Sequence, residues 1–319
     1  MTFRTPTMGT TLLSQTLIGI LGNFSLFYCL QHDQCLQKPT DLILKHLVLA
    51  NSLTLLFNGV PLSIAAFGWK HFLDDLGCKV FFYIQRVGRS VAISTTCLLG
   101  VCQAVTISQN NSCLKDLRLE SSISFCVNLC WALHLVLNMS FPLYAHSKWI
   151  LTNRTKKRDF QYCGSECSDE TMRAMYTALL LFPELCFSVL ITVASGAMVL
   201  FLTKHVKQVQ YLHGPQAYPR VSPEFRAVHS ILTLGSTFII LYTVSSILSI
   251  WVAFCSSPSG WLINLNTLIS MCFPTLSPFI LLKHHIRRAR PCSGLKRNTK
   301  SFVRRMRDCM VHVLFIQSF

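Results

Sequence analysis

Seven long apolar stretches constrain this chain more than any other feature of its sequence. They cover residues of about 9 to 31, 42 to 64, 79 to 107, 121 to 144, 174 to 202, 228 to 254 and 261 to 282. A helix of about 20 mostly apolar residues crosses the hydrocarbon core of a bilayer, where unpaired backbone groups are not tolerated. The sequence therefore predicts an all-α fold: a seven-transmembrane helix bundle over residues 1–282, followed by a basic tail over residues 283–319. The first stretch lacks the cleavage site of a signal peptide, so we expect it to be retained.

Composition favours a membrane protein over a nucleic-acid-binding one. Of the 319 residues, 51% are hydrophobic and 13% are charged, and the formal net charge is +16. The basic residues lie in short clusters between apolar stretches, without a zinc-finger or RNA-binding signature. Basic clusters beside membrane helices contact anionic lipid headgroups. We therefore expect membrane lipids, and no nucleic acid, as partners.

The distribution of positive charge predicts the orientation of the bundle. With the N-terminus outside, the three cytoplasmic loops and the tail carry 18 of the 29 Lys and Arg residues. Cytoplasmic segments are normally the more basic ones, so the bias has the expected sign. The glycosylation motif that begins at Asn153 then lies in the outer loop after the fourth stretch. We expect a multi-pass plasma-membrane protein with a cytoplasmic C-terminus.

Cysteines on the predicted outer side lie at the third stretch and in the loop after the fourth. Cys78 opens the third stretch, and Cys163 and Cys167 lie in the outer loop within "CGSEC". Disulfides persist in this oxidising compartment. A CxxxC pair without partner histidines is poor zinc spacing, so we expect no metal site there. A bridge from Cys78 to one of the two loop cysteines is the favoured interpretation.

Two arginines interrupt the third stretch. Arg86 and Arg89 share a helix face, and Glu184 lies at a similar depth in the fifth stretch. Charged groups inside a membrane are costly unless they face the bundle interior and are paired. The three form either an ion pair that fixes helix packing or a ligand site, and one acid leaves a surplus positive charge. That surplus is met either by carbonyls and water or by an acidic or strongly hydrogen-bond-accepting ligand. Tyr83 either lines the pocket or is a lipid-facing or packed ring.

Short motifs carry a resemblance to a known family. "GILGN" with Asn23, "LVLAN" with Asn51, and the central Trp131 resemble the rhodopsin-like seven-helix receptors. A finer resemblance, to the vomeronasal type 1 pheromone receptors, rests on motifs that follow one another in that family's order: "KPTDLILKHLVLAN", "RVGR", "TTCLLGVCQAVTIS", "TKKRDFQYC", "ASGAMV", "SPEFRAVHSIL" and "CFPTLSPFIL". It covers residues of about 10 to 282.

This resemblance implies a chemosensory receptor that binds a small, pheromone-like ligand from outside and needs no cofactor. It implies a heterotrimeric G protein of the inhibitory or olfactory type as partner. It also implies that Cys78 pairs with Cys163, because the family-like segment "RDFQYC" ends there. Gln85 stands where amine receptors place an aspartate, which adds it to the ligand-binding set. Four residues at the predicted cytoplasmic ends are expected to face the G protein: Gln103, Lys204, Lys207 and Arg226.

The chain departs from most rhodopsin-like receptors at several switches, as the vomeronasal type 1 receptors also do. Cys102-Gln103-Ala104 stands in place of Asp-Arg-Tyr, and no tyrosine lies three residues beyond Pro274 or Pro278. Departures from the vomeronasal pattern itself, at Gln85, at Cys102 and in the C-terminal tail, make a receptor relic with weak signalling one alternative, and a bitter-taste-like receptor is another. A seven-helix transporter predicts a duplicated three-helix unit, which the sequence lacks. No nucleotide-binding or hydrolase motif is present, so we do not expect an enzyme.

The predicted orientation is tested by glycosylation. Asn153 should carry a glycan in membrane-inserted protein, so Asn153→Gln should increase gel mobility to that of glycosidase-treated protein. Asn110→Gln, in a loop predicted to be cytoplasmic, is the matched control and should leave mobility unchanged. The reverse pattern would mean that the topology is inverted.

Overall fold

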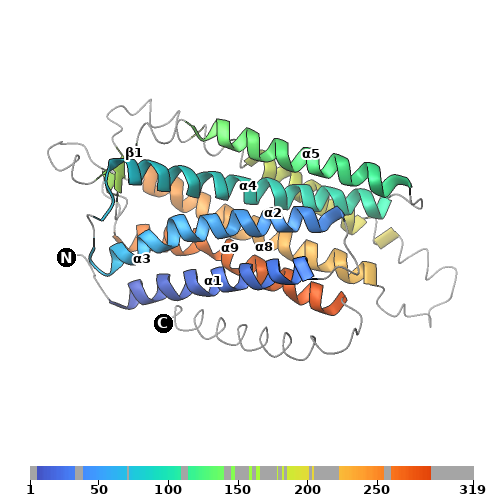
Figure 1. Ribbon diagram of the computed structural model, residues 1–319, viewed down its shortest axis with the longest axis horizontal. Coiled ribbons are helices and arrows are strands. Elements are labelled where there is room, and N and C mark those ends of the chain that lie inside the picture. The colour runs from blue at the N-terminus through green and yellow to red at the C-terminus, as the bar shows by residue number, and fades with distance from the viewer. Residues whose placement is uncertain are drawn as a thin grey trace.

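The computed structural model describes residues 6–32, 39–69, 72–108, 114–139, 145–147, 158–159, 163–165, 178, 182, 185–200, 203–204, 223–254 and 260–288. Long helices dominate these residues and lie side by side in one bundle (Figure 1). They are α1 (Pro6–His32), α2 (Pro39–Thr54), continued by the π-helical turn η2 (Leu55–Gly59) and α3 (Val60–Ala66), α4 (Asp75–Ser108), α5 (Leu114–Leu137), an unlabelled helix over Leu185–Leu200, α8 (Pro223–Phe254) and α9 (Gly260–Arg288). The helical bundle expected from the sequence is confirmed.

The helices have the length and surface of membrane spans. Among the described residues, four are long and apolar enough to cross a bilayer: Met8–Gln31, Thr40–Ala66, Leu232–Val252 and Trp261–Lys283. Ser121–Leu137 and Leu185–Leu200 are shorter apolar helices. The 34 residues of α4 extend over about 51 Å at ~1.5 Å per residue. Large apolar side chains such as Phe24 (68% exposed) and Phe125 (67% exposed) face outward, as a lipid-facing surface requires.

A small antiparallel sheet, which the all-α expectation did not include, lies at one end of the bundle. Its strands are β1 (Ala145–Ser147), β2 (Arg158–Asp159) and β3 (Cys163–Ser165), in the order β1-β3-β2. β1 contacts α4 and lies beside its first turns (Figure 1). We call this the strand end of the bundle; α1 and α9 also begin there.

Side-chain amides on α1 hold α9 in place. Pro278 has no backbone N–H, so the carbonyl of Pro274 cannot receive its usual bond within the helix. The Nδ2 of Asn23 donates instead to that carbonyl over 3.0 Å, and also to Gly19 O over 2.8 Å. A Cβ at Gly22 would come within 2.8 Å of the Phe279 ring, so the small residue permits this close approach.

Helices α2 and α4 pack almost backbone to backbone at Gly88. A Cβ at this position would lie 2.9 Å from Ala50 O and 3.2 Å from the backbone nitrogen of Thr54. Both atoms belong to the main chain of α2 and cannot move aside. Farther along, Pro61 cannot donate to the carbonyl of Phe57, and the chain accommodates it with the π-helical turn that precedes α3.

A polar contact between side chains joins α5 to α2. Trp131 donates its Nε1–H to the Nδ1 of His46 over 3.1 Å, and the two rings meet edge to face. His46 must therefore carry its proton on Nε2, because Nδ1 accepts.

We predict that Gly88→Ala destabilises the bundle, because the added methyl group forces α2 and α4 apart. Overpacking of this kind costs about 1 to 3 kcal/mol. The matched control is Gly196→Ala, whose Cβ would meet no atom within 4 Å. Both changes bring the same gain in helix propensity, so the thermal midpoint of the detergent-solubilised Gly88→Ala protein should be several degrees lower. Equal midpoints for the two variants would contradict this account of the interface.

We also predict that the disulfide partner of Cys78 is Cys163. The sulfur of Cys78 is disulfide-bonded. In the sheet, Cys163 lies opposite Ser147 of β1, the strand that contacts α4. Peptide mapping of non-reduced protein should therefore recover Cys78 linked to Cys163. Recovery of Cys78 linked to Cys167, a residue outside the described ranges, would show that the assignment is wrong.

Candidate functional site

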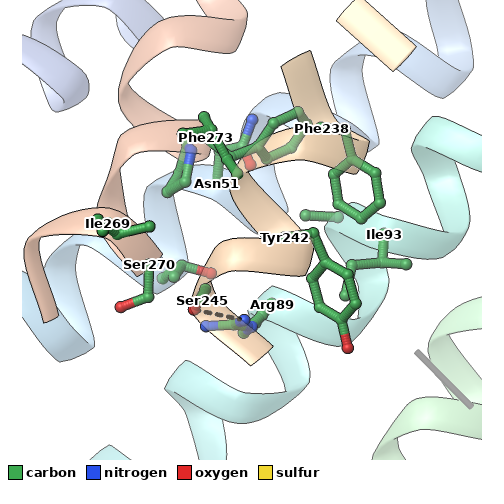
Figure 2. Close-up of a pocket in the computed structure, with 13 residues that line it drawn as sticks. Asn51, Arg89, Ile93, Phe238, Tyr242, Ser245, Ile269, Ser270 and Phe273 are labelled. Atoms are coloured by element: carbon green, nitrogen blue, oxygen red, sulfur yellow. Dashed lines mark hydrogen bonds between the residues drawn. The ribbon is translucent and has the colours of Figure 1, made fainter. Parts of the chain in front are cut away.

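A small cavity lies between α2, α4, α8 and α9 (Figure 2). Its volume is about 30 Å³. The apolar part of its wall comes from aromatic and branched side chains of α4, α8 and α9. Its polar lining residues are Asn51, Thr54, Arg89, Tyr242, Ser245 and Ser270.

Arg89 dominates the chemistry of this cavity. Its Nη2 donates to the Oγ of Ser245 on α8 over 3.3 Å, and its Cζ lies 5.7 Å from the centre of the Tyr242 ring. Figure 2 shows the guanidinium directed from α4 towards Ser245. A cation over an aromatic face gains electrostatic stabilisation that grows as water is excluded. The half-buried charge is therefore supported by two contacts to α8.

An aromatic ladder connects Tyr242 to α9. The Tyr242 ring stacks on Phe238, with centres 5.4 Å apart and planes at 9°. Phe238 in turn meets Phe273 of α9 edge to face at 4.9 Å. Offset stacking and edge-to-face contacts are the favoured arrangements of aromatic pairs. Tyr242 is thus connected to α9 by a continuous series of ring contacts.

The opposite wall of the cavity carries a buried amide and a proline. Asn51 is 1% exposed and donates its Nδ2–H to the Oγ of Ser277 over 2.8 Å. Its Oδ1 is buried and has no hydrogen-bond partner within the described part of the chain. Pro274 has no N–H, so the backbone carbonyl of Ser270 lacks its usual donor within α9. This wall therefore has hydrogen-bonding capacity that the helices themselves do not fill.

The structure separates the ligand-binding residues expected from the sequence. Among the described residues, Arg89 lines the cavity, whereas Gln85, Arg86 and Tyr83 are not part of its wall. Gln85 is one turn nearer the strand end, and its buried Oε1 has no hydrogen-bond partner within the described ranges. Tyr83 donates its hydroxyl to Leu135 O over 2.9 Å and so faces α5. Arg86 is half-buried on α4.

Several expected site residues cannot be placed by their side chains. Glu184, Asn153 and Lys207 lie outside the described residues, and Cys163 and Arg226 are described only by the backbone of β3 and α8. Lys204 is exposed and Gln103 is half-buried near the end of α4 that lies away from the strands.

Sequence reasoning missed part of the cavity lining. Ser245 and Ser270 are single hydroxyl residues in apolar spans, and nothing in the sequence distinguishes them from Ser and Thr residues that bond to their own helix. Thr54, for example, donates to Ala50 O over 3.0 Å. Asn51 stands out in the sequence only through its motif. Among the described residues no group of three or more His, Cys, Asp and Glu side chains is placed to hold a metal ion.

Comparison with known proteins identifies the family. The model of the vomeronasal organ pheromone receptor family matches residues 6–293. The chain belongs to this family. It is 42% identical over 280 residues to human vomeronasal type-1 receptor 4, covering 85% of this chain and 92% of that protein. It is also 31% identical over 288 residues to rat vomeronasal type-1 receptor 94, covering 86% of this chain and 85% of the rat protein.

The fold matches a solved structure of the rhodopsin class. Squid rhodopsin superimposes with a TM-score of 0.66 at 16% identity, over 88% of this chain and 82% of that one. Together, the family and the fold identify a multi-pass membrane protein of the chemosensory receptor type. The family membership favours the receptor interpretation over the transporter and the bitter-taste alternatives, and it points away from an enzyme.

Proposed function

We propose that this chain is a plasma-membrane pheromone receptor whose ligand enters at the strand end and whose opposite end activates a heterotrimeric G protein. The N-terminus is then outside and the C-terminal tail cytoplasmic. The family, named for pheromone receptors, supports the ligand class. The ligand is small and largely apolar, with an acidic or hydrogen-bond-accepting group.

The observation that carries this proposal is Arg89, a guanidinium held among four helices by Ser245 and Tyr242. An arginine in a membrane interior is retained only where it is paired, hydrated or functional. An acidic group of the ligand that approaches from the strand end passes Gln85 one turn before Arg89. Arg86 lies between them in the sequence, and Glu184 is the one acid within the seven apolar stretches.

Binding at Arg89 changes the contacts on which α8 depends. The guanidinium donates to Ser245 and lies over Tyr242, so a competing acid on the ligand weakens its hold on α8. The aromatic ladder from Tyr242 through Phe238 connects this change to α9. A ligand shifts the balance between two bundle arrangements only by such differential contacts. The arrangement that the ligand favours opens the end of the bundle that lies away from the strands.

The G protein contacts the end of the bundle away from the strands. Lys204 is exposed, and Gln103 lies near the end of α4. Lys207 and Arg226 belong to the same basic loop in the sequence. An inhibitory or olfactory-type G protein fits the family.

Arg89→Gln tests the proposal. Cells that express the receptor are screened with small apolar carboxylic acids and with amines of matched size, using a G-protein readout. Acids should activate and amines should be poor agonists. Loss of one charge-assisted contact costs about 1.5 to 3 kcal/mol, so Arg89→Gln should raise the half-maximal concentration of an active acid by roughly ten- to a hundredfold.

Surface expression separates binding from folding. Arg89→Gln should reach the surface at a near-normal level, as should the control Lys283→Gln, which removes an exposed charge. If instead Arg89→Gln abolishes surface expression, and Arg89→Gln with Glu184→Gln restores both expression and response, the arginine serves packing alone. If the wild-type receptor reaches the surface but no acid activates it, the result would favour the alternative of a receptor relic with weak signalling.

A further inference from the structure

The Arg89 cavity combines a strong hydrogen-bond donor with acceptors that the helices leave unfilled. Arg89 carries five N–H groups on a planar guanidinium. The Oδ1 of Asn51 is buried and has no hydrogen-bond partner within the described part of the chain. The backbone carbonyl of Ser270 lacks its usual donor because Pro274 has no N–H. A group that fits this cavity should therefore accept hydrogen bonds and also donate one.

Both acceptors belong to the wall of the cavity. Asn51 is 1% exposed and lines the cavity from α2, whereas Ser270 and Pro274 line it from α9. A helix carbonyl points along the axis towards the residue four positions on, so the carbonyl of Ser270 lies between these two lining residues. Figure 2 shows Asn51, Ser270 and Arg89 around the same cavity. The acceptors and the guanidinium therefore face one shared space.

Two hydroxyl groups of the lining are already committed to helix carbonyls. Thr54 donates to Ala50 O over 3.0 Å, and Ser270 donates its Oγ–H to Thr267 O over 2.9 Å. A hydroxyl group has one hydrogen to donate. Neither group is left to serve Asn51, and a molecule that enters the cavity is the natural source of the missing donor.

The size of the cavity limits the group that enters it. A buried water needs about 10 to 15 Å³ of such space, whereas organic ligands occupy pockets of roughly 300 to 1,000 Å³. The volume of about 30 Å³ is therefore enough for a hydroxyl group beside one water molecule. The apolar body of a ligand has to remain outside, towards the strand end.

A hydroxyl group matches these partners better than a carboxylate does. Its oxygen accepts from Arg89, and its hydrogen can be donated to the Oδ1 of Asn51. An ionised carboxylate only accepts. Inside the cavity it would leave the Asn51 oxygen without a donor and place a negative charge against it, and a buried acceptor without a donor is costly. The carboxylate of an acidic ligand therefore binds Arg89 from the strand end, outside the cavity.

We propose that the ligand is a hydroxy acid whose carboxylate meets Arg89 from the strand end and whose hydroxyl group enters the cavity and donates to the Oδ1 of Asn51. Both groups contact the same guanidinium, which places the hydroxyl group on a carbon close to the carboxyl group. A water molecule beside the hydroxyl group serves the carbonyl of Ser270. This inference rests on the proposed function, because it specifies the ligand of the same site.

Matched ligands test the donated hydrogen. Cells that express the full-length receptor are given hexanoic, octanoic and decanoic acids, their 2-hydroxy and 3-hydroxy derivatives, and the corresponding fluoro derivatives, with a G-protein readout. In at least one series the hydroxy acid should act at a roughly three- to tenfold lower concentration than its parent, because it releases an ordered water and keeps that water's hydrogen bonds. Fluorine is close to a hydroxyl group in size and has no hydrogen to donate, so the fluoro acid should be about tenfold weaker than the hydroxy acid.

Thermal unfolding gives a second readout that does not need signalling. At equal concentration, the hydroxy acid should raise the thermal midpoint of the detergent-solubilised receptor more than its parent acid does, since tighter binding to the folded state stabilises it more. If acids activate and stabilise the receptor but the hydroxyl group brings no gain over hydrogen or fluorine, this inference is overturned and the proposed function stands. If no acid of any series activates or stabilises the receptor, the proposed function fails and this inference fails with it.

Variants of the cavity wall locate the hydroxyl group, and the readout is the concentration ratio between a parent acid and its hydroxy acid within each variant. Asn51→Leu removes the acceptor and should abolish the preference for the hydroxy acid. Ser277→Ala removes the partner of the Asn51 Nδ2 but leaves Oδ1 in place, so the preference should remain. Equal loss in both variants would mean that Asn51 acts through packing and would overturn its assignment as the acceptor.

Pro274→Ala distinguishes the two acceptors. It restores a backbone N–H that can bond to the carbonyl of Ser270, and it leaves Asn51 unchanged. The preference for the hydroxy acid should therefore persist in this variant. Loss of the preference in Pro274→Ala, with its retention in Asn51→Leu, would assign the hydroxyl group to the carbonyl and overturn the proposal. The ligand series on the wild-type receptor still decides the matter if Asn51→Leu does not reach the surface.

Discussion

The absence of water from the bilayer core is the constraint on which this structure depends, because each backbone group there needs a partner within the protein. Two prolines in α9 remove backbone donors inside that region. Asn23 replaces one of them by donating to the carbonyl of Pro274. The motif asparagine in the first span is thus a structural substitute for a missing N–H, and Gly22 beside it lets the two helices come close enough.

The same constraint explains why the cavity lies where it does. At Pro278 the freed carbonyl is served by α1, but at Pro274 the freed carbonyl of Ser270 belongs to a residue of the cavity wall. A polar cavity is the natural alternative to a side-chain donor, because a water molecule can enter it and donate to the carbonyl. α9 is therefore firmly held on its α1 side, through Asn23 and through Gln15, which donates to Leu268 O over 3.1 Å. On its α8 side it meets the aromatic ladder and lines the cavity together with Arg89.

The charge of Arg89 links ligand binding to helix packing. Lipid makes an isolated guanidinium expensive, and Arg89 reduces that cost with a hydroxyl and an aromatic face that both belong to α8. Both contacts of Arg89 join α4 to α8. A change of partner at Arg89 therefore changes how these two helices pack. Squid rhodopsin shares this bundle. In this chain the second span carries Asn51, and the positive charge is part of the third span itself.

The sequence by itself determined the helical bundle, the membrane setting and the family, because each rests on local signals: apolar length, the placement of basic residues and short motifs in a fixed order. It also singled out Arg86 and Arg89, since charges in an apolar stretch are conspicuous in any sequence. It did not determine which arginine faces the cavity or that Tyr83 bonds to α5. Only the tertiary structure decided these points, together with the lining roles of Ser245, Ser270 and Asn51. The reason is geometric: the rotation of each helix about its axis is set by contacts such as Gly88 against the α2 backbone, which join residues far apart in the chain.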